Sequence, residues 1–304
     1  MRASPAADGE HRRLLRAVGA TYAAALAPAL GAALLLRGHS PIAVAAVADA
    51  VATLVVFAAS VLHGNSSLYD PYWSVAPVPI ALGWAAAGEG AEPIRRALVL
   101  GLVTIWAIRL TANCLVRWRS LTHEDFRYVE IRARTGRWYW PASLVAIHLL
   151  PTVWVFLGLL PLHPALALPG HPLGALDLAA TAVTAAAIAL EAGADLQLRR
   201  HLRTRRDPAA VLETGLWARS RHPNYLGEVL FWWGLWLFGV AAAPGRPWTF
   251  VGPLWITLLF LFVSVPWMDR RMAARHPAYL ARIQAVPALL PWPRKGASRP
   301  SGTA

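Results

Sequence analysis

The chain contains a polar stretch, Arg219-Ser220-Arg221-His222-Pro223-Asn224-Tyr225-Leu226-Gly227-Glu228, that leads directly into the apolar run Val229–Phe238. Groups able to bind phosphate, form hydrogen bonds and titrate therefore lie at the N-terminus of an apolar helix, and Glu228 lies within that helix. A charge inside an apolar span is costly, so such a residue is a candidate for function. The stretch predicts a membrane-spanning helix with a binding site at its polar end.

The composition indicates a polytopic membrane protein. Of the 304 residues, 57% are hydrophobic and 15% are charged, which is too apolar for a soluble domain. The net charge is +13, but the arginines flank apolar segments, as the positive-inside rule describes, and we expect no nucleic-acid partner. The single cysteine, Cys114, allows no internal disulfide. The histidines lack ligand spacing, so no metal site is predicted.

A bilayer core takes about 20 apolar residues as helix, and by that measure the sequence offers eight candidate spans, the third and seventh of them short. They are roughly Ala17–Leu36, Ile42–Leu62, Val75–Ala87, Ala97–Val116, Ala142–Leu160, Ala175–Ala194, Glu228–Ala243 and Phe250–Trp267. We therefore expect an all-α transmembrane bundle of about seven or eight spans. Residues 1–16 are expected to form a polar tail, residues 17–293 a single transmembrane domain, and residues 294–304 a disordered tail.

The arginines are distributed unevenly over the loops. Clusters precede the first span and follow the fourth, sixth and eighth, whereas the intervening loops carry only Arg37, Arg95, Arg96 and Arg246. An even number of spans with both termini in the cytoplasm satisfies this bias. We expect the protein in the cytoplasmic membrane, with Arg95 and Arg96 as the residues that fit this topology least well.

The sixth span carries a polar stripe. Glu191, Asp195, Arg199 and Arg203 are spaced by four residues and share one helix face. One interpretation is a ladder of salt bridges within the helix. The other is one side of a cofactor site, in which carboxylates bind amide or hydroxyl groups and arginines bind phosphates.

The helix start in the opening stretch suits an anion. Pro223 favours the first helical turn, and free N–H groups there attract negative charge. Arg219 and Arg221 add formal charge, while Asn224 and Glu228, four residues apart, point the same way. The alternative is an ordinary helix start with a buried glutamate paired to an arginine.

Further motifs accompany this stretch. They are Asn65-Ser66-Ser67-Leu68-Tyr69-Asp70-Pro71-Tyr72-Trp73-Ser74, His123-Glu124-Asp125-Phe126-Arg127-Tyr128, Glu191-x-x-x-Asp195-x-Gln197, Gly215-Leu216-Trp217, Trp232-Trp233-Gly234 and Arg275-His276-Pro277-Ala278-Tyr279-Leu280, with Leu290-Pro291 after the last. Together they resemble the steroid 5-alpha-reductase superfamily, and within it most resemble an uncharacterised bacterial branch of multi-span membrane proteins. The resemblance spans roughly Ser60 to Pro293.

The resemblance implies a membrane reductase that uses NADPH to saturate a carbon–carbon double bond conjugated to a carbonyl, in an apolar, lipid-like substrate. Asp195, Asn224, Tyr225, Glu228 and Tyr279 match cofactor-contacting positions, while the characterised reductases have Asn where this chain has Glu191. With the residues argued above, the expected cofactor site comprises Glu191, Asp195, Arg199, Arg221, His222, Asn224, Tyr225, Glu228 and Tyr279.

The N-terminal half offers candidates for the chemistry. A tyrosine hydroxyl or a protonated carboxyl would hydrogen-bond the substrate carbonyl as negative charge develops on its oxygen. Tyr72 with Asp70 is the first choice and Tyr128 the second. The expected polar pocket adds Trp73, Arg109, Asn113, Glu124 and Asp125. The aromatic residues also suit an interfacial belt, and Arg109 also suits simple neutralisation of Glu191 or Glu228.

Two other functions fit parts of the sequence. Membrane isoprenylcysteine and phospholipid methyltransferases share an Arg-His-Pro-x-Tyr segment and bind S-adenosylmethionine. They typically carry a Glu-Glu pair near the last helix, where this chain reads Asp269-Arg270-Arg271. A transporter or channel would not require cationic groups of the phosphate-binding type concentrated at one face.

Overall fold

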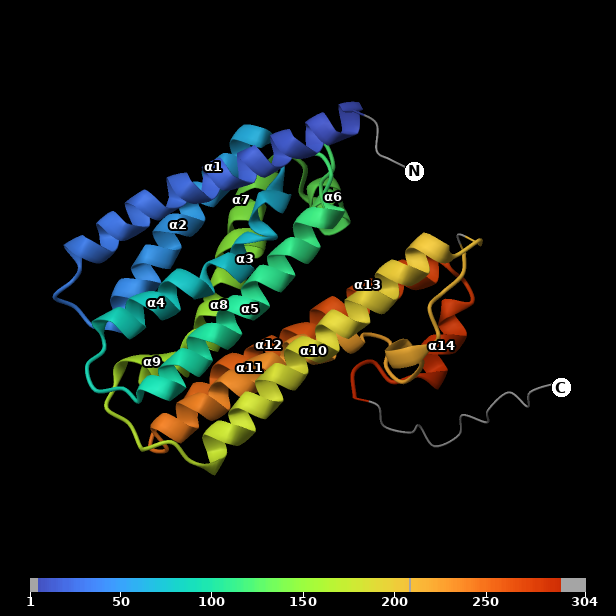
Figure 1. Cartoon of the computed structure of the whole chain (residues 1–304). Helices are drawn as coiled ribbons and strands as arrows, with labels where there is room; N and C mark the ends of the chain where they lie inside the picture. Colours follow the sequence, from blue (N-terminus) through green and yellow to red (C-terminus); the bar gives the residue numbers. More distant parts are fainter. Residues whose placement is uncertain (1–4, 208, 291–304) are drawn as a thin grey trace. The chain divides into compact units, whose positions relative to one another are not determined.

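A computed structural model describes residues 5–207 and 209–290, and these residues form helices and turns with no strand. The predicted all-α class is therefore confirmed. Within the described ranges, seven helical segments are long and apolar enough to cross a membrane (Figure 1), as expected of a multi-span membrane protein: Asp8–Leu35, Pro41–His63, Pro93–Arg117, Phe126–Leu159, Ala175–Thr204, Pro223–Ala242 and Pro247–Arg275. The tail expected at residues 294–304 lies outside the described residues.

The chain divides into two compact units. Unit 1 comprises Met1–Asp177 and Leu235–Gly252, and unit 2 comprises Leu178–Gly234 and Pro253–Ala304. The helices of unit 1 are α1 (Pro5–Leu35), α2 (Pro41–His63), η1 (Ser66–Tyr69), α3 (Tyr72–Val75), α4 (Pro77–Ala87), α5 (Pro93–Arg117), α6 (Phe126–Thr135), η2 (Gly136–Trp138), α7 (Tyr139–Ser143), the π-helical turn η3 (Leu144–Leu149), α8 (Leu150–Leu159), α9 (Leu162–Ala167) and η5 (Pro247–Phe250).

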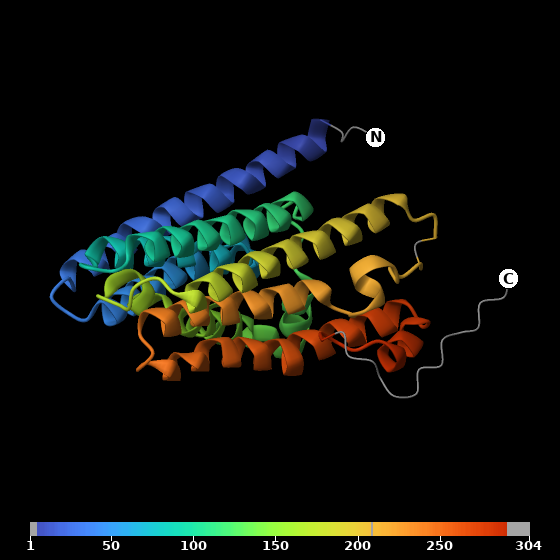
Figure 2. The ribbon, with the colours of Figure 1, turned by 60° about the horizontal axis from the view of Figure 1, so that its bottom comes forward.

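Unit 2 holds most of α10 (Ala175–Thr204), the first part of α11 (Pro223–Ala242) and most of α12 (Val251–Leu259). Its other elements are η4 (Gly215–Ala218), the π-helical turn η6 (Phe260–Ser264), α13 (Val265–Arg275) and α14 (Tyr279–Ala285). Figure 2 shows α12, η6 and α13 following one another as one continuous helical segment.

Helix starts in unit 1 follow from local sequence. Proline occupies the first turn of α2, α4 and α5, where its missing N–H costs nothing. Ser40 caps α2 by accepting a hydrogen bond of 3.1 Å from the N–H of Ala43. Glu92 caps α5 in the same way, at 2.6 Å from the N–H of Arg95. The boundaries of these two helices are thus encoded locally.

The third expected span, Val75–Ala87, is helical but too short to cross a membrane alone: α4 covers Pro77–Ala87, and Val75 ends the four-residue α3. The longer segment from Ser66 to Ala87 is broken into the short helices η1, α3 and α4. Pro71 and Pro77 disfavour a helix that runs unbroken from η1 through α3 into α4. Eleven residues of helix rise only about 17 Å, less than the roughly 30 Å of a bilayer core. The short seventh span, by contrast, is a full helix of 20 residues, α11.

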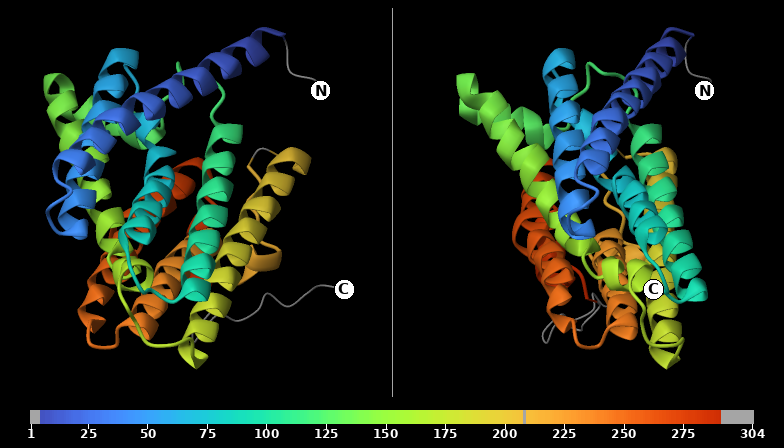
Figure 3. Two further views of the ribbon diagram at one scale, coloured as in Figure 1. Left: turned by 60° about the vertical axis from the view of Figure 1, so that its left-hand side comes forward. Right: turned by 90° about the vertical axis from the view of Figure 1, so that its left-hand side faces the viewer.

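The broken segment nevertheless returns the chain across unit 1. At one end, which we call the Trp118 end, Leu14, Leu68 and Trp118 share one buried cluster. At the other, the Trp84 end, the indole of Trp84 donates a hydrogen bond of 3.1 Å to the carbonyl of Pro41 at the start of α2. Figure 3 shows α4 beside α5. The even number of spans expected from the arginine distribution stays a prediction, because α4 is shorter than the seven helical segments that could cross a membrane.

Arg95, which fitted the expected topology poorly, is neutralised. Its side chain is 1% exposed and binds both carboxylate oxygens of Asp177, at 2.6 and 2.9 Å. It also donates to the carbonyl of His171 at 3.0 Å. The neighbouring Arg96 donates to the carbonyl of Gly88, at 3.0 Å. Because the positive-inside rule concerns charges left facing water, a buried ion pair at the Trp84 end does not contradict it.

Candidate functional site

In unit 2, α10 and α11 approach each other closely at Gly227. A Cβ atom at this position would lie 2.7 Å from the Cβ of Glu191 and 2.9 Å from the carbonyl of Ala187, so only glycine fits. The contact sets Glu191 against the turn of α11 that contains Glu228. Both carboxylates are buried, and Glu228 accepts a hydrogen bond of 2.8 Å from the indole of Trp232.

The motif Gly215-Leu216-Trp217 forms a turn that is bonded to α10, in part through Gln197 of the motif Glu191-x-x-x-Asp195-x-Gln197. The side-chain oxygen of Gln197 accepts the N–H of Leu216 at 2.9 Å. The indole of Trp217 donates to the carbonyl of Ala194 at 3.1 Å. Gly215 has a φ of +63°, which a residue with a side chain rarely adopts. These residues fix the loop that precedes α11, and Asp195, which is also buried, lies on the stretch of α10 that they hold.

Asp269 is the centre of the polar cluster in unit 2. Its carboxylate accepts hydrogen bonds from Arg221 at 2.7 Å, from His222 Nε2 at 2.8 Å and from the hydroxyl of Tyr279 at 3.0 Å. Burial, with the nearby Asp269 charge, raises the pKa of Tyr279 well above its ordinary value, so its hydroxyl stays protonated. One acid on α13 thus joins α11 to the Arg-His-Pro-x-Tyr segment near the C-terminus.

The geometry gives Arg221 a structural role instead of the expected phosphate contact. Its guanidinium is 6% exposed, pairs with Asp269, and donates to the carbonyls of Ile283 and Val286. The backbone N–H groups of Arg221 and His222 bind the carbonyls of Pro287 and Ala288, each at 3.0 Å. All these donors are used within the protein, so Arg221 holds the C-terminal segment against the start of α11.

Other polar groups of unit 2 remain open to a ligand. The side-chain oxygen of Asn224 and Nδ1 of His276 are buried and have no hydrogen-bond partner among the described residues. Arg199 is half-buried and Arg203 exposed, and neither forms an ion pair with any described residue. The salt-bridge ladder is therefore not formed at its basic end. His222 stacks on Tyr225, with ring centroids 5.1 Å apart and planes at 11°.

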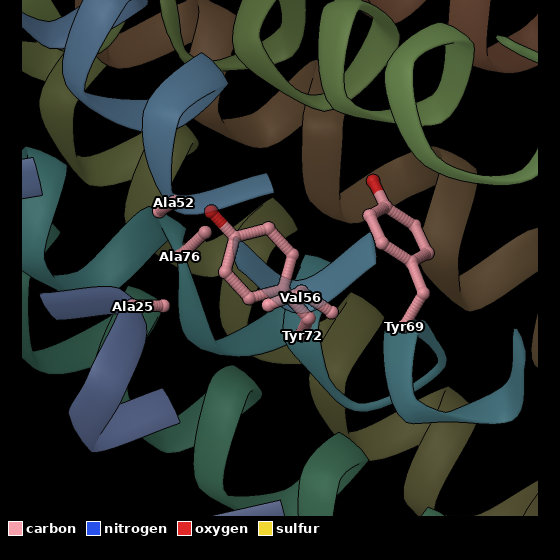
Figure 4. Close-up of a cluster of buried hydrophobic side chains, with 6 residues drawn as sticks. All are labelled: Ala25, Ala52, Val56, Tyr69, Tyr72 and Ala76. Carbon is pink, nitrogen blue, oxygen red and sulfur yellow. The ribbon is translucent and has the colours of Figure 1, made fainter. Parts of the chain in front are cut away.

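In unit 1, Tyr72 pairs with a different acid from the one expected. Its hydroxyl donates a hydrogen bond of 2.8 Å to Asp49 on α2, and both side chains are buried. In Figure 4 the rings of Tyr69 and Tyr72 lie near each other and their hydroxyls point toward different helices. The hydroxyl of Tyr69 instead meets Thr152 on α8, at 2.8 Å. The expected pairing of Tyr72 with Asp70 is replaced because the turn after α2 faces Tyr72 back toward α2.

Asp70 pairs with the second expected tyrosine. The hydroxyl of Tyr128 donates to Asp70 at 2.5 Å, and Arg127 lies 3.5 Å from the same carboxylate. Burial raises the pKa of Asp70 to about 6, with Arg127 and the Tyr128 hydrogen bond acting in the opposite direction. Asp70 and Tyr128 therefore form a second acid–tyrosine pair, at the Trp118 end.

The expected polar pocket is brought together only in part. Glu124 and Asp125 lie beside η1, where Glu124 accepts the N–H of Ser66 at 2.8 Å and the N–H of Asp125 donates to Ser67 Oγ at 2.8 Å. Trp73 packs on Trp106, with ring centroids 5.9 Å apart. The two α5 members of the expected pocket, one helical turn apart, are buried or half-buried: Arg109 and Asn113.

Three residues of these clusters were missed from sequence. Asp49 is the single acid in the apolar helix α2, and its position inside a span was the available signal. In the sequence, Asp269 stands beside Arg270 and Arg271, and His276 lies within Arg275-His276-Pro277-Ala278-Tyr279-Leu280, so neither residue carries a separate signal of its role. Among residues 5–207 and 209–290, no group of three His, Cys, Asp or Glu side chains could hold a metal ion.

Comparison with known proteins identifies the family. A family model described as "Protein of unknown function (DUF1295)" matches residues 56–283. An uncharacterised protein of the fission yeast Schizosaccharomyces pombe is 28% identical over 251 residues, covering 74% of this chain and 72% of the yeast protein. No solved structure matches the chain significantly. The chain belongs to the DUF1295 family, which lies within the steroid 5-alpha-reductase-like group.

Proposed function

We propose that the protein is an NADPH-dependent reductase of a carbon–carbon double bond conjugated to a carbonyl, acting on an apolar, lipid-like substrate in the membrane. The observation that carries this proposal is the buried Tyr72–Asp49 pair, with its hydrogen bond of 2.8 Å. A tyrosine and an acid inside an apolar bundle are costly to bury, and together they form a proton-donating group.

The residues of unit 2 fit a dinucleotide. The side-chain oxygen of Asn224 is a buried acceptor without a partner, suited to an amide or hydroxyl donor. Nδ1 of His276 is similarly open, and Arg199 supplies a cation without an ion pair for a phosphate. Glu191, Asp195, Tyr225, Glu228 and Tyr279 complete the cofactor residues that we propose, while Arg221 and His222 support them through Asp269.

The chemistry assigned to unit 1 is stabilisation of negative charge and delivery of a proton. Bound NADPH would supply hydride to the carbon beta to the carbonyl. The Tyr72 hydroxyl then hydrogen-bonds the carbonyl oxygen as charge develops on it. When Asp49 carries a proton, it donates to the Tyr72 oxygen, and the Tyr72 hydrogen is free for the substrate. The double bond gains one hydride and one proton in total.

The same pair argues against the methyltransferase alternative. Transfer of a methyl group from S-adenosylmethionine requires a nucleophile and needs no proton donor for the acceptor. The place of the Glu-Glu pair typical of those enzymes is taken by Asp269, whose carboxylate is already bound by Arg221, His222 and Tyr279.

Nucleotide binding to the purified protein in nanodiscs tests the cofactor. NADPH fluorescence titration is compared with S-adenosylmethionine binding on one sample. Loss of a charge-assisted hydrogen bond costs about 1.5–3 kcal/mol, which corresponds to roughly a tenfold to hundredfold weaker affinity. Glu228→Gln should weaken NADPH binding by this amount while the protein still folds. Asn224→Ala removes a neutral acceptor worth about 0.5–1.5 kcal/mol, so it should weaken NADPH binding by about twofold to tenfold.

The matched control is Thr204→Ala, an exposed truncation at the end of α10. It should bind NADPH like the wild type. If the wild-type protein binds S-adenosylmethionine but not NADPH, the proposed reductase function would be replaced by the methyltransferase function. Equal NADPH affinity in the wild type and both site variants would remove the cofactor site from the start of α11.

A further inference from the structure

Unit 1 contains a chain of side-chain hydrogen bonds that the proposed chemistry does not use. The hydroxyl of Tyr139 donates to Glu124 at 2.9 Å and lies 2.6 Å from Ser66 Oγ. Ser66 Oγ lies 2.9 Å from Ser143 Oγ. Ser143 Oγ in turn lies 3.5 Å from Nδ1 of His148. We call these five residues the Glu124–His148 chain.

The two ends of this chain differ in their access to water. The Glu124 side chain is 11% exposed and binds Arg132, whose side chain is 36% exposed. Ser66, Ser143 and His148 have no exposed surface at all. The chain therefore leads from the aqueous side of the Trp118 end to a titratable ring in the interior of the bundle.

The backbone around His148 is π-helical, and it places hydrogen-bond acceptors beside both ring nitrogens of His148. Residues Leu144–Leu149 form the π-helical turn η3, a distortion common at functional sites. The carbonyl of Ser143 lies 3.0 Å from Nδ1 of His148. Ser60 Oγ lies 3.1 Å from Nε2 and also donates to the carbonyl of Val56. Both ring nitrogens thus have acceptors, and an imidazolium there would have both N–H groups satisfied.

We propose that the Glu124–His148 chain is a proton relay that carries solvent protons to His148 in the membrane interior. Its purpose rests on the proposed reduction, which consumes one proton in each turnover at a site closed to water. His148 lies against the ring of Tyr69, with centroids 5.1 Å apart, and Tyr69 lies against Tyr72 at 5.5 Å. The relay thus ends one aromatic ring away from the Tyr72–Asp49 pair, and the final transfer from His148 to that pair would pass through a water molecule between them.

The transfer moves one proton and changes no oxidation state. Glu124, protonated from water, gives its hydrogen to the Tyr139 oxygen, and Tyr139 passes its own hydrogen to Ser66. Ser66 passes its hydrogen to Ser143, and Ser143 passes its hydrogen to Nδ1 of the neutral His148 ring, which holds its other hydrogen on Nε2. The last transfer spans 3.5 Å, so it requires a small rotation of the ring or the hydroxyl.

Exchange of the His148 ring proton with water tests the relay without any substrate. The protein is labelled with ¹⁵N-histidine in nanodiscs, and the His148 signal is assigned by its loss in His148→Gln. A fully buried ring proton with a relay should exchange rapidly. A positioned acid or base typically contributes at least about 100-fold to proton transfer, so Tyr139→Phe and Ser66→Ala should slow exchange by about that factor.

The controls separate the relay from packing. Tyr139→Phe keeps the ring that packs under Arg132, whose guanidinium carbon lies 3.6 Å from the ring centroid. Thr152→Val removes a buried hydroxyl that bonds Tyr69 and Thr53 outside the relay, and it should leave exchange unchanged. Slow exchange in the wild type, or unchanged exchange in Tyr139→Phe, would overturn the relay.

The link to the reaction is a separate measurement. With a reducible enone, Tyr139→Phe should lower kcat and raise the solvent isotope effect while NADPH affinity stays the same. If the wild type reduces no enone but ring exchange is fast and depends on Tyr139, the relay stands and the proposed reduction fails. If enones are reduced and the His148 ring proton exchanges equally fast in Tyr139→Phe and the wild type, the proposed reduction stands and the relay fails.

Discussion

The hydroxyl of Tyr72 donates a hydrogen bond of 2.8 Å to Asp49, across 23 residues of sequence and between a short helix and a long one. If this hydroxyl binds the substrate carbonyl, Tyr72→Phe should leave NADPH affinity intact and lower turnover. Loss of one oxyanion-type donor typically costs on the order of 100- to 1000-fold in rate. NADPH oxidation over a panel of conjugated enones measures the effect.

Tyr128→Phe is the internal control for this prediction. It removes the corresponding hydroxyl from the second acid–tyrosine pair, with Asp70. Turnover should fall far less in Tyr128→Phe than in Tyr72→Phe. Equal turnover in Tyr72→Phe and the wild type would eliminate the role of Tyr72, and a loss confined to Tyr128→Phe would transfer that role to the other pair.

The partner of Tyr72 could not be predicted from sequence, although Tyr72 itself was. Spacing by three or four residues identifies neighbours on one helix, as it did for Glu191 and Asp195. Asp49 and Tyr72 meet only because the prolines of the segment between α2 and α5 break it into short helices. Where such a segment folds back depends on tertiary packing, which the hydrophobic pattern does not encode.

Contacts between residues far apart in the sequence could not be predicted in unit 2 either. The apolar pattern predicted α11, and the motifs singled out its polar start. The convergence of Arg221, His222 and Tyr279 on Asp269 depends on residues separated by as many as 48 positions. Arginine beside an apolar span is equally compatible with a phosphate contact and with a buried ion pair, so the sequence left the role of Arg221 open to error.

Arg221 and Arg199 should differ in what they support. Arg221→Lys removes the paired contact with Asp269 and the donors to Ile283 and Val286, so thermal stability should fall. Arg199→Ala leaves no described partner unpaired, so stability should hold while NADPH affinity falls. Thermal unfolding and NADPH titration on both variants check this. A stable Arg221→Lys variant with weaker NADPH binding would restore the phosphate role of Arg221.

The Arg95–Asp177 pair should be among the most sensitive structural contacts of unit 1. Both side chains are at most 4% exposed. Removing one member of a buried ion pair leaves the other charge uncompensated and costs about 3–5 kcal/mol. Asp177→Asn should therefore unfold at a clearly lower temperature. Glu89→Gln, an exposed change at the same end, should unfold like the wild type, and equal melting of the two variants would contradict the prediction.

The return of the chain through α4 makes a topological prediction. Reporter fusions after Arg137 and Arg206 should report the cytoplasm. A cysteine introduced at Glu89, in the loop between α4 and α5, should react with a membrane-impermeant reagent only from the opposite side, in a background where Cys114 is replaced by Ala. Labelling of Glu89→Cys from the cytoplasmic side would mean that α4 does not return the chain across the membrane.

Asp70 should make stability depend on pH in an unusual direction. Its pKa rises from 3.8 in the unfolded chain to about 6 in the folded one, chiefly through burial. The folded protein therefore holds this proton more tightly, and the stability that it contributes is fully present below about pH 3.8. That contribution is lost as the pH rises through about 6.

Asp70→Asn provides the reference for this prediction. Its side chain cannot titrate, and it keeps an oxygen that accepts the hydrogen bond of the Tyr128 hydroxyl. The melting temperature of the wild type minus that of Asp70→Asn should fall between about pH 4 and pH 6 and stay level above it. A difference that rises over this window would show that Arg127 and Tyr128 outweigh burial at Asp70.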